Sequence, residues 1–502
     1  MNRNAVRRGF CVCAVVFGLF VLAACDDFNR SLEDDVEFYL TVIPVGTWAE
    51  LKSAAGGTSG PGLIGLTGDI EADGVDPVVI SRPLTITGLE GRRVIRRGVV
   101  SSFTGALFRV DAGGGLTLGH PQGGTLVLDG GDVTANAPLV SVAGGALILR
   151  DGAVLQNNDR TGGGGGVEVL GGSYFTMTGG TISGNIAASN GGGVYVSSGG
   201  NCTMTGGTIN GNSASSRGGG VYADSGGFEM KGGTISGNSA SSRGGGVYVT
   251  GSSSFTMSGG TISGNSASNG GGGGGGVCVD ARSGDNTAFT MSGGTISDNS
   301  AGNGGGGVYV AATSNGAAAG FTMSGGTISD NSAGNGGGGG VYVAARSSGN
   351  TAFTMSGGTI SGNSADNGGG GGVFVAATSS SGNTVFTMSS GTISGNSAVS
   401  DGGSLGGGVC VYNAGSGGSA VFTMSSGTIG GNSAGLGGGV YVQESNFTKA
   451  GGVIYGSGGG GNSNQASQGY AAYAVNGVHK WRNETAGPGV SLNSVGAGGW
   501  DP

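Results

Sequence analysis

Few side chains in this sequence have the types and spacing that catalysis or metal binding would require. Asp298 and Asp330 occupy one position in successive copies of a repeated segment, where the other copies have glycine. Carboxylates stacked about 5 Å apart could bind a cation or act as an acid–base pair, although drift of a solvated turn is the simpler interpretation. His120 and His479 lie near opposite ends of the chain and cannot share a site. We therefore predict no catalytic residue, no metal and no cofactor.

A second set of acids lies in the irregular stretch 62–158, which contains Asp111, Asp129, Asp132 and Asp151. Polysaccharide lyases and hydrolases use clustered carboxylates, so an active site would be expected here if the protein were an enzyme. The near-identical repeats that follow argue against catalysis, because an active site requires a few segments to differ from their neighbours in a specific way. We predict a non-enzymatic protein and keep a polysaccharide lyase or hydrolase as the alternative.

A row of aromatic side chains is the stronger candidate for binding. Each lies between two valines, or in an equivalent segment, and alternation along a strand would point it outward. Such a row suits sugar rings or a partner protein, and its alternative role is to protect the sheet beneath it. The predicted ligand-binding residues are Tyr195, Tyr222, Tyr248, Tyr309, Tyr342, Phe374 and Tyr441. A Thr-x-Ser array, as at Thr261 and Ser263, makes ice binding a third hypothesis.

These residues recur because the sequence is a tandem repeat of about ten copies. A segment Thr-Ile-Ser, with Asn or Gly sometimes replacing Ser, returns every 26 to 36 residues, and a period of this size marks a repeat architecture. Its copies begin at Thr181, Thr208, Thr234, Thr261, Thr295, Thr327, Thr359, Thr392 and Thr428. Each copy has three short strand-like segments, as at Val247–Val249, Phe255–Met257 and Thr261–Ser263, separated by Gly and Ser turns. Such triplets bury their inner faces only by stacking, which predicts an all-β, single-stranded parallel β-helix of about fourteen coils.

Alternation along the strands assigns the two faces of each coil. Val247, Val249, Phe255, Met257 and Ile262 are predicted to point inward, and the residues between them outward. One asparagine recurs in the turn after the third strand, and we predict a ladder of side-chain amides that satisfies backbone groups of neighbouring coils. The ladder comprises Asn185, Asn212, Asn238, Asn265, Asn299, Asn331, Asn363, Asn396 and Asn432.

Three cysteines interrupt these columns. Cys202 replaces an inward Phe, whereas Cys278 and Cys410 replace outward Tyr residues four coils apart. Four coils correspond to roughly 19 Å, whereas a disulfide requires Cα atoms within about 7 Å. We therefore predict free thiols.

The N-terminus has the features of a secreted lipoprotein. Residues 1–24 combine Arg3, Arg7 and Arg8 with an apolar stretch too short to span a membrane comfortably, and we predict a signal peptide. The stretch ends Leu-Ala-Ala-Cys25, which resembles the bacterial lipobox and implies cleavage before Cys25 and lipid attached to it. An ordinary signal peptide or a buried anchor is the alternative.

The rest of the chain divides into four further parts. Residues 25–46 are a predicted acidic tether, and 47–161 a cap followed by degenerate coils, in which Thr47 and Glu50 form the capping box of a short helix. Residues 162–448 are the ten repeats. Residues 449–502 are a last coil and an aromatic C-terminal cap.

Composition limits the partners. Of the 502 residues 124 are glycine and 10% are charged, and the net charge of −8 becomes −11 once the three leader arginines are removed. Because the sequence has no basic stripe, nucleic acid is a poor partner. The expected partners are a membrane, through lipid on Cys25, and a host or matrix protein or a glycan.

The Gly-Gly-Gly-Val-Tyr-Val and Thr-Ile-Ser-Gly-Asn motifs resemble repeats of right-handed β-helix proteins of the pectin-lyase-like superfamily, across roughly residues 62–493. They are most similar to repeat-rich bacterial surface lipoproteins. They resemble more distantly the chlamydial polymorphic outer-membrane proteins, whose FxxN motif has Ile or Ser here in place of Phe. The resemblance implies a right-handed β-helix in the cell envelope, at the outer membrane or cell surface rather than the inner membrane. It implies adhesion, shielding or antigenic display, with an ice- or glycan-binding solenoid as a further alternative.

Overall fold

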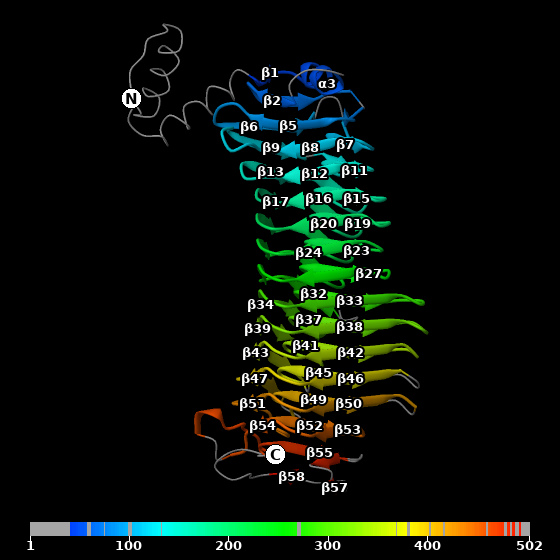
Figure 1. Ribbon diagram of the computed structural model, residues 1–502, viewed down its shortest axis with the longest axis vertical. Helices are drawn as coiled ribbons and strands as arrows, with labels where there is room; N and C mark the ends of the chain where they lie inside the picture. Colours follow the sequence, from blue (N-terminus) through cyan, green and yellow to red (C-terminus); the bar gives the residue numbers. More distant parts are fainter. Residues whose placement is uncertain are drawn as a thin grey trace, which may run out of the picture.

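The computed structural model describes most of the chain from residue 41 onward. The described ranges are 41–57, 62–74, 76–98, 103–131, 133–268, 273–367, 369–378, 382–400, 403–414, 417–457 and 460–475, with the short strands at 479–481, 484–486 and 491–492. The predicted leader, Cys25 and most of the predicted tether lie outside these residues. The described chain winds into one long parallel β-helix with the N-terminal coils at one end and the C-terminal coils at the other (Figure 1).

One central coil shows how a repeat folds. Its strands are β27 (Val247–Thr250), β28 (Ser254–Met257), β29 (Thr261–Ser263) and β30 (Ser266–Ala267). They belong to four sheets, here named C, A, B and D respectively. Each strand pairs in parallel with the equivalent strand of the next coil, so that Ile235, Ile262 and Ile296 lie side by side in sheet B. The first three strands confirm the prediction, but the two-residue strand of sheet D was missed because two residues cannot display an alternating pattern.

The sheets extend through the whole described rod. Sheets A, B, C and D contain 17, 14, 15 and 10 strands. The solenoid makes about 12 turns, slightly fewer than the fourteen predicted. The turns at both ends are the least complete, because sheet D runs only from β10 (Thr134–Ala135) to β48 (Ser397–Val399).

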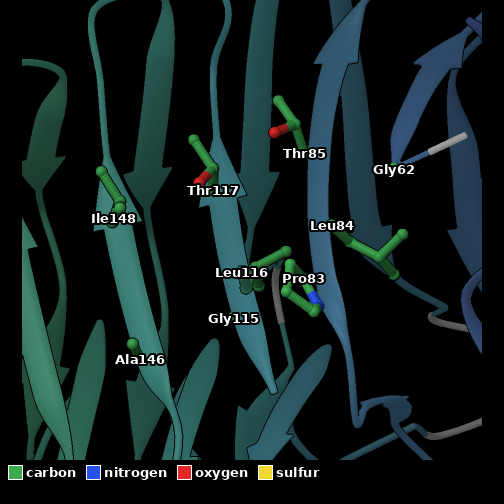
Figure 2. Close-up of a pocket in the computed structure, with 9 residues that line it drawn as sticks. All are labelled: Gly62, Pro83, Leu84, Thr85, Gly115, Leu116, Thr117, Ala146 and Ile148. Carbon is green, nitrogen blue, oxygen red and sulfur yellow. The ribbon is translucent and has the colours of Figure 1, made fainter. Parts of the chain in front are cut away.

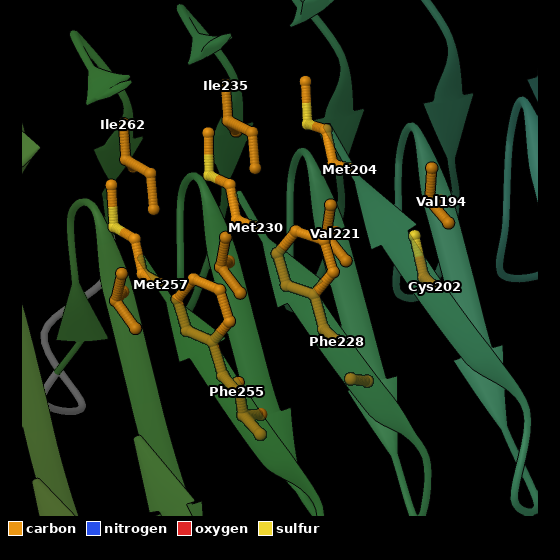
Figure 3. Packing of buried hydrophobic residues seen from close by; sticks show 14 of the residues in the cluster. Val194, Cys202, Met204, Val221, Phe228, Met230, Ile235, Phe255, Met257 and Ile262 are labelled. Atoms are coloured by element: carbon orange, nitrogen blue, oxygen red, sulfur yellow. The ribbon is translucent and has the colours of Figure 1, made fainter. Parts of the chain in front are cut away.

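Columns of like side chains fill the interior (Figure 3). The five residues predicted to point inward in the central coil are all buried, with exposed fractions of 0 or 1%. From Phe228 to Phe447 the phenylalanine rings of sheet A stack with centroids 4.6–4.9 Å apart, which is the strand spacing. Cys202 interrupts this column between Phe175 and Phe228, as predicted.

The α-helix α3 (Trp48–Gly56) covers the N-terminal end of the β-helix (Figure 1). Thr47 and Glu50 form the predicted capping box, and Trp48, Leu51 and Ala55 are buried. The strand β1 (Ile43–Val45) precedes α3 and pairs with β2 (Leu63–Leu66) of sheet A. These three residues fall within the predicted acidic tether of residues 25–46, but they form a strand of sheet A, and Val45 is part of the core.

The C-terminal end departs from the parallel pattern. The 3-10 helix η1 (Gly460–Asn462) precedes β55 (Ala472–Val475) and β56 (His479–Trp481). The strands β57 (Glu484–Ala486) and β58 (Ser491–Leu492) then pair antiparallel with β56 and β55. Strands that pair antiparallel end the coil-to-coil ladder, as a terminal cap requires. Trp500 of the predicted aromatic cap lies outside the described residues.

The coils widen abruptly after β28. Strands β32 (Val277–Ala281) and β33 (Asn286–Met291) have five and six residues, where β27 and β28 have four, and the wider form continues to β49 (Val409–Asn413) and β50 (Ser419–Met424). The outline of the rod steps outward at this point (Figure 1). The inserted residues extend both flanking strands as well as the corner between them, and Ala281 at the end of β32 and Thr287 near the start of β33 are buried.

Candidate functional site

The predicted aromatic row exists, but it is not an exposed surface. Six of its seven members belong to a second buried cluster outside the bore of the helix, with exposed fractions of 0–8%, and Tyr195 is partly buried. The rings of Tyr195, Tyr222 and Tyr248 stack with centroids 5.0 and 5.2 Å apart, and Cys278 ends this stack. A ligand could reach most of these rings only by displacing the segments that cover them.

The glycine run before each Val-Tyr-Val strand covers the row. A Cβ atom at Gly218 would lie 2.8 Å from Cβ of Tyr222, and one at Gly244 would lie 2.8 Å from Cβ of Tyr248. Both glycines also have positive φ angles, of 65° and 64°. Only glycine meets both conditions, so the run lets the backbone pack directly on the aromatic residues. The prediction that the aromatic row is exposed was wrong. A glycine run has no pattern of side chains, so the sequence gives no sign that this backbone packs over the aromatic rings.

A compact group of charged residues lies at the step where the coils widen. Asp280 is fully buried and forms ion pairs with Arg243 at 2.8 Å and Arg282 at 3.0 Å. Thr313 donates a hydrogen bond of 2.8 Å to the same carboxylate, and the Tyr248 hydroxyl donates another. The cluster therefore joins the last narrow coil to the first two wide ones.

Burial raises the pKa of Asp280, but the Arg243 charge, the hydrogen bonds from Tyr248 and Thr313, and the Arg282 charge outweigh it, so that the pKa is lowered. Burial, followed by the charge of Asp280, raises the pKa of Tyr248 well above its usual value. Asp280 is thus a buried carboxylate held ionised by its partners, which is the arrangement of a structural joint rather than of a general base.

The asparagine ladder is present as predicted. Each side-chain Nδ2 donates to Oδ1 of the next asparagine at 2.9–3.0 Å, and the backbone N–H of each donates to the same oxygen at 2.9–3.0 Å. From Asn212 to Asn432, Nδ2 also donates to an isoleucine carbonyl oxygen of an earlier coil at 2.9–3.0 Å. Each amide therefore satisfies buried backbone groups that no water could reach.

The ladder is longer than predicted. Asn158 precedes it and Asn464 follows it, both fully buried and in register. They lie 27 residues before Asn185 and 32 residues after Asn432, so the period alone could have identified them.

A buried arginine ends the ladder on its N-terminal side. Nε of Arg97 donates to Oδ1 of Asn158 at 3.2 Å, and Nη2 donates to the carbonyl oxygens of Ala137 and Pro138, both at 3.0 Å. Burial, and then the charge of Arg160, lower the pKa of Arg97 to about 10. Because the amides are aligned with their oxygens toward the N-terminal end, the cation lies at the negative end of the stack.

The candidate catalytic carboxylates do not converge. Asp111 ends a strand of sheet C and pairs with Arg109 at 2.8 Å, whereas Asp129 ends a strand of sheet B and accepts a hydrogen bond from Gln156. Asp151 lies in the turn between sheets A and B, and Asp132 lies outside the described residues. Among the described residues no group of three or more His, Cys, Asp or Glu side chains could hold a metal ion.

The stacked aspartates also occupy strained turn positions. Asp298 and Asp330 both have φ of 57°, the left-handed conformation that glycine adopts in the equivalent turns. Aspartate tolerates this conformation better than most residues, which accounts for the substitution without a catalytic role.

A shallow groove lies on the outer face of sheet A near the N-terminal end. It has a volume of about 360 Å³ and crosses β5 (Pro83–Gly88), β8 (Gly115–Leu118) and β12 (Ala146–Leu149). Figure 2 shows two rows of lining residues across these strands, Thr85, Thr117 and Ile148 in one, and Pro83, Gly115 and Ala146 in the other.

Parallel strands that stack coil on coil around an apolar bore, with an asparagine ladder in one turn, define a right-handed parallel β-helix. Residues 135–288 match the family model described as a right handed beta helix region. No curated protein and no solved structure matches the chain. Within the described residues, no helix has the length and apolar character needed to cross a membrane.

Proposed function

We propose that this protein is a non-enzymatic, lipid-anchored component of the bacterial cell envelope whose β-helix presents a repetitive surface for adhesion, shielding or antigenic display. The observation that carries the proposal is the uniformity of the repeat coils. Along sheet B the outward residues Thr261 and Ser263 have Thr and Ser as their partners in the next coil, and the inward isoleucine is unchanged. Repetition of one surface suits presentation, because each additional coil extends the rod without altering its face.

Two further features support the proposal. The described acids that could have formed an active site do not converge, since Asp111 and Asp129 end strands of different sheets and Asp151 lies in a turn. The lipobox at Cys25 would attach the N-terminal end to a membrane. The N-terminal cap α3 would then face the membrane side, with the repeats projecting away from it.

The anchor and the display are tested separately. Cells that express the chain are fed a radiolabelled fatty acid, and label is expected on the native protein but not on Cys25→Ser, with Cys202→Ser as the matched control that keeps its label. Intact cells are then treated with a protease, and loss of the repeats without lysis is expected. Unlabelled native protein would refute the anchor, and repeats that survive on intact cells would refute surface display. Turnover of a polysaccharide that Asp129→Ala abolishes would refute the non-enzymatic assignment.

A further inference from the structure

The groove on sheet A lies where the outward columns depart from the repeat. Strand pairing places Pro83, Gly115, Ala146 and Tyr174 in one column, followed by Asn201. Tyr174 begins β16 (Tyr174–Met177), and its side chain is the most exposed large apolar group among the described residues, at 59%. An exposed ring therefore stands next to Ala146, at one end of a strip of small side chains on the same face.

Packing does not require the small residue at the centre of this strip. A Cβ atom at Gly115 would meet only Pro83 atoms, at 3.7 and 4.0 Å, which is ordinary contact, and Gly115 lacks a positive φ angle. By contrast, Gly114 next to it could not accept a Cβ, which would lie 2.1 Å from the carbonyl oxygen of Ile80. Glycine at position 115 thus leaves open space on the surface, which is the role of a strand glycine where a ligand approaches the backbone.

The chemistry around the groove selects the class of ligand. The second row contains Thr85, Thr117 and Ile148, all partly buried, and none of the nine lining residues is charged. The volume of about 360 Å³ lies at the small end of the range for ligand sites. A neutral sugar matches these groups, because its ring faces stack on an aromatic ring and its hydroxyls both donate to and accept from threonine.

We propose that this groove, bounded by Tyr174 and floored by Gly115, binds a short stretch of a neutral oligosaccharide. The chain of sugars runs across β5, β8 and β12 toward β16, parallel to the axis of the rod. The proposal is independent of the lipid anchor and of surface display, because it depends only on the geometry of sheet A.

The test is calorimetric titration of the purified full chain with cellohexaose, chitohexaose and mannohexaose, and with hexagalacturonate as the acidic counterpart. At least one neutral probe is expected to bind with a Kd below about 1 mM, a weak affinity suited to a shallow site. Gly115→Val fills the floor and Tyr174→Ala removes the ring, and each is expected to raise Kd about tenfold or more. Tyr174→Phe keeps the ring and should change Kd less than about twofold.

Gly320→Val is the matched control, because Gly320 lies in the same outward column far from the groove and a Cβ there meets nothing within 4 Å. It should leave both folding and Kd unchanged. If Gly115→Val does not fold, Tyr174→Ala alone tests the proposal, because the Tyr174 ring is mostly exposed and its removal should not disturb folding. The proposal is overturned if no neutral probe binds, if both groove variants bind like the native chain, or if hexagalacturonate binds at least as tightly.

Discussion

Replacing a central asparagine of the ladder by alanine should destabilise the coils on either side by a calculable amount. Asn265→Ala removes four hydrogen bonds, two donated by its Nδ2 to Ile235 and Asn299 and two accepted by its Oδ1 from Asn238. The backbone N–H of Asn238 and one N–H of its amide then lack acceptors, and Asn238 is 1% exposed, so water cannot replace them. At about 1–3 kcal/mol for each stranded donor, the expected loss is about 4 kcal/mol.

The loss should be local, because each coil of a solenoid contacts only its neighbours. Hydrogen exchange followed by mass spectrometry should therefore show protection falling by up to about a thousandfold around β25 (Thr234–Ser236) and β29, with distant coils unchanged. Asn335→Ala is the control. The exposed side chain of Asn335 accepts one hydrogen bond, of 2.8 Å, from Asn367, and the loss of this bond should cost less than about 0.5 kcal/mol. Equal effects of the two variants would refute the assignment of stability to the ladder.

Asn265→Asp adds a test of the direction of the hydrogen bonds. The carboxylate still accepts from Asn238 but cannot donate to Asn299, so its oxygen faces another oxygen in a buried site. Destabilisation should exceed that of the alanine variant near neutral pH and diminish in acid, where a protonated carboxyl can donate. A variant whose stability is independent of pH would contradict the geometry.

Four shorter predictions follow from other buried groups. Burial raises the pKa of the Cys202 and Cys278 thiols to about 12, so the three described thiols, including Cys410, should resist alkylation at pH 8 until the chain is unfolded. Cys202→Phe should extend the stacked phenylalanine column and raise stability by about 1 kcal/mol in urea titrations. Folding lowers the pKa of Asp280, so its ion pairs contribute fully to the stability of the fold above its unfolded pKa of about 3.9. This stabilisation should be lost as the pH falls through the lower pKa of the folded state, and hydrogen exchange around β32 should then become faster. Arg97→Met should cost about 3–5 kcal/mol, seen as loss of exchange protection in the N-terminal coils only.

Much of the interior could be predicted from sequence because it repeats with the strand. Alternation placed Phe255, Met257 and Ile262 inward, and one period placed the asparagines in register. These positions follow from two short-range rules, the two-residue period of a strand and the coil-to-coil stacking of a solenoid. The free thiols followed from the same register, because Cys278 and Cys410 lie four coils apart in one column of sheet C.

The features that the sequence could not reveal depend on contacts without a periodic signal. Arg97 lies 61 residues from Asn158, and only the fold brings its guanidinium to the end of the ladder. The burial of the tyrosine row depends on backbone that folds back over it, which hydrophobic pattern does not record. The Asp280 cluster arises because Arg243 and Arg282 come from different coils, at the first step from narrow coils to wide ones.

The site inferred on sheet A follows from the way the inner and outer faces of a strand are separated. In β8 and β12, Leu116 and Leu147 point into the core and are buried, while Gly115 and Ala146 point outward. Because successive side chains alternate, an outward position can change from asparagine to tyrosine or glycine without disturbing the bore. The uniform coils therefore supply the stability and length of the rod. The irregular N-terminal coils, whose outer faces differ from one to the next, are where a specific ligand can be recognised.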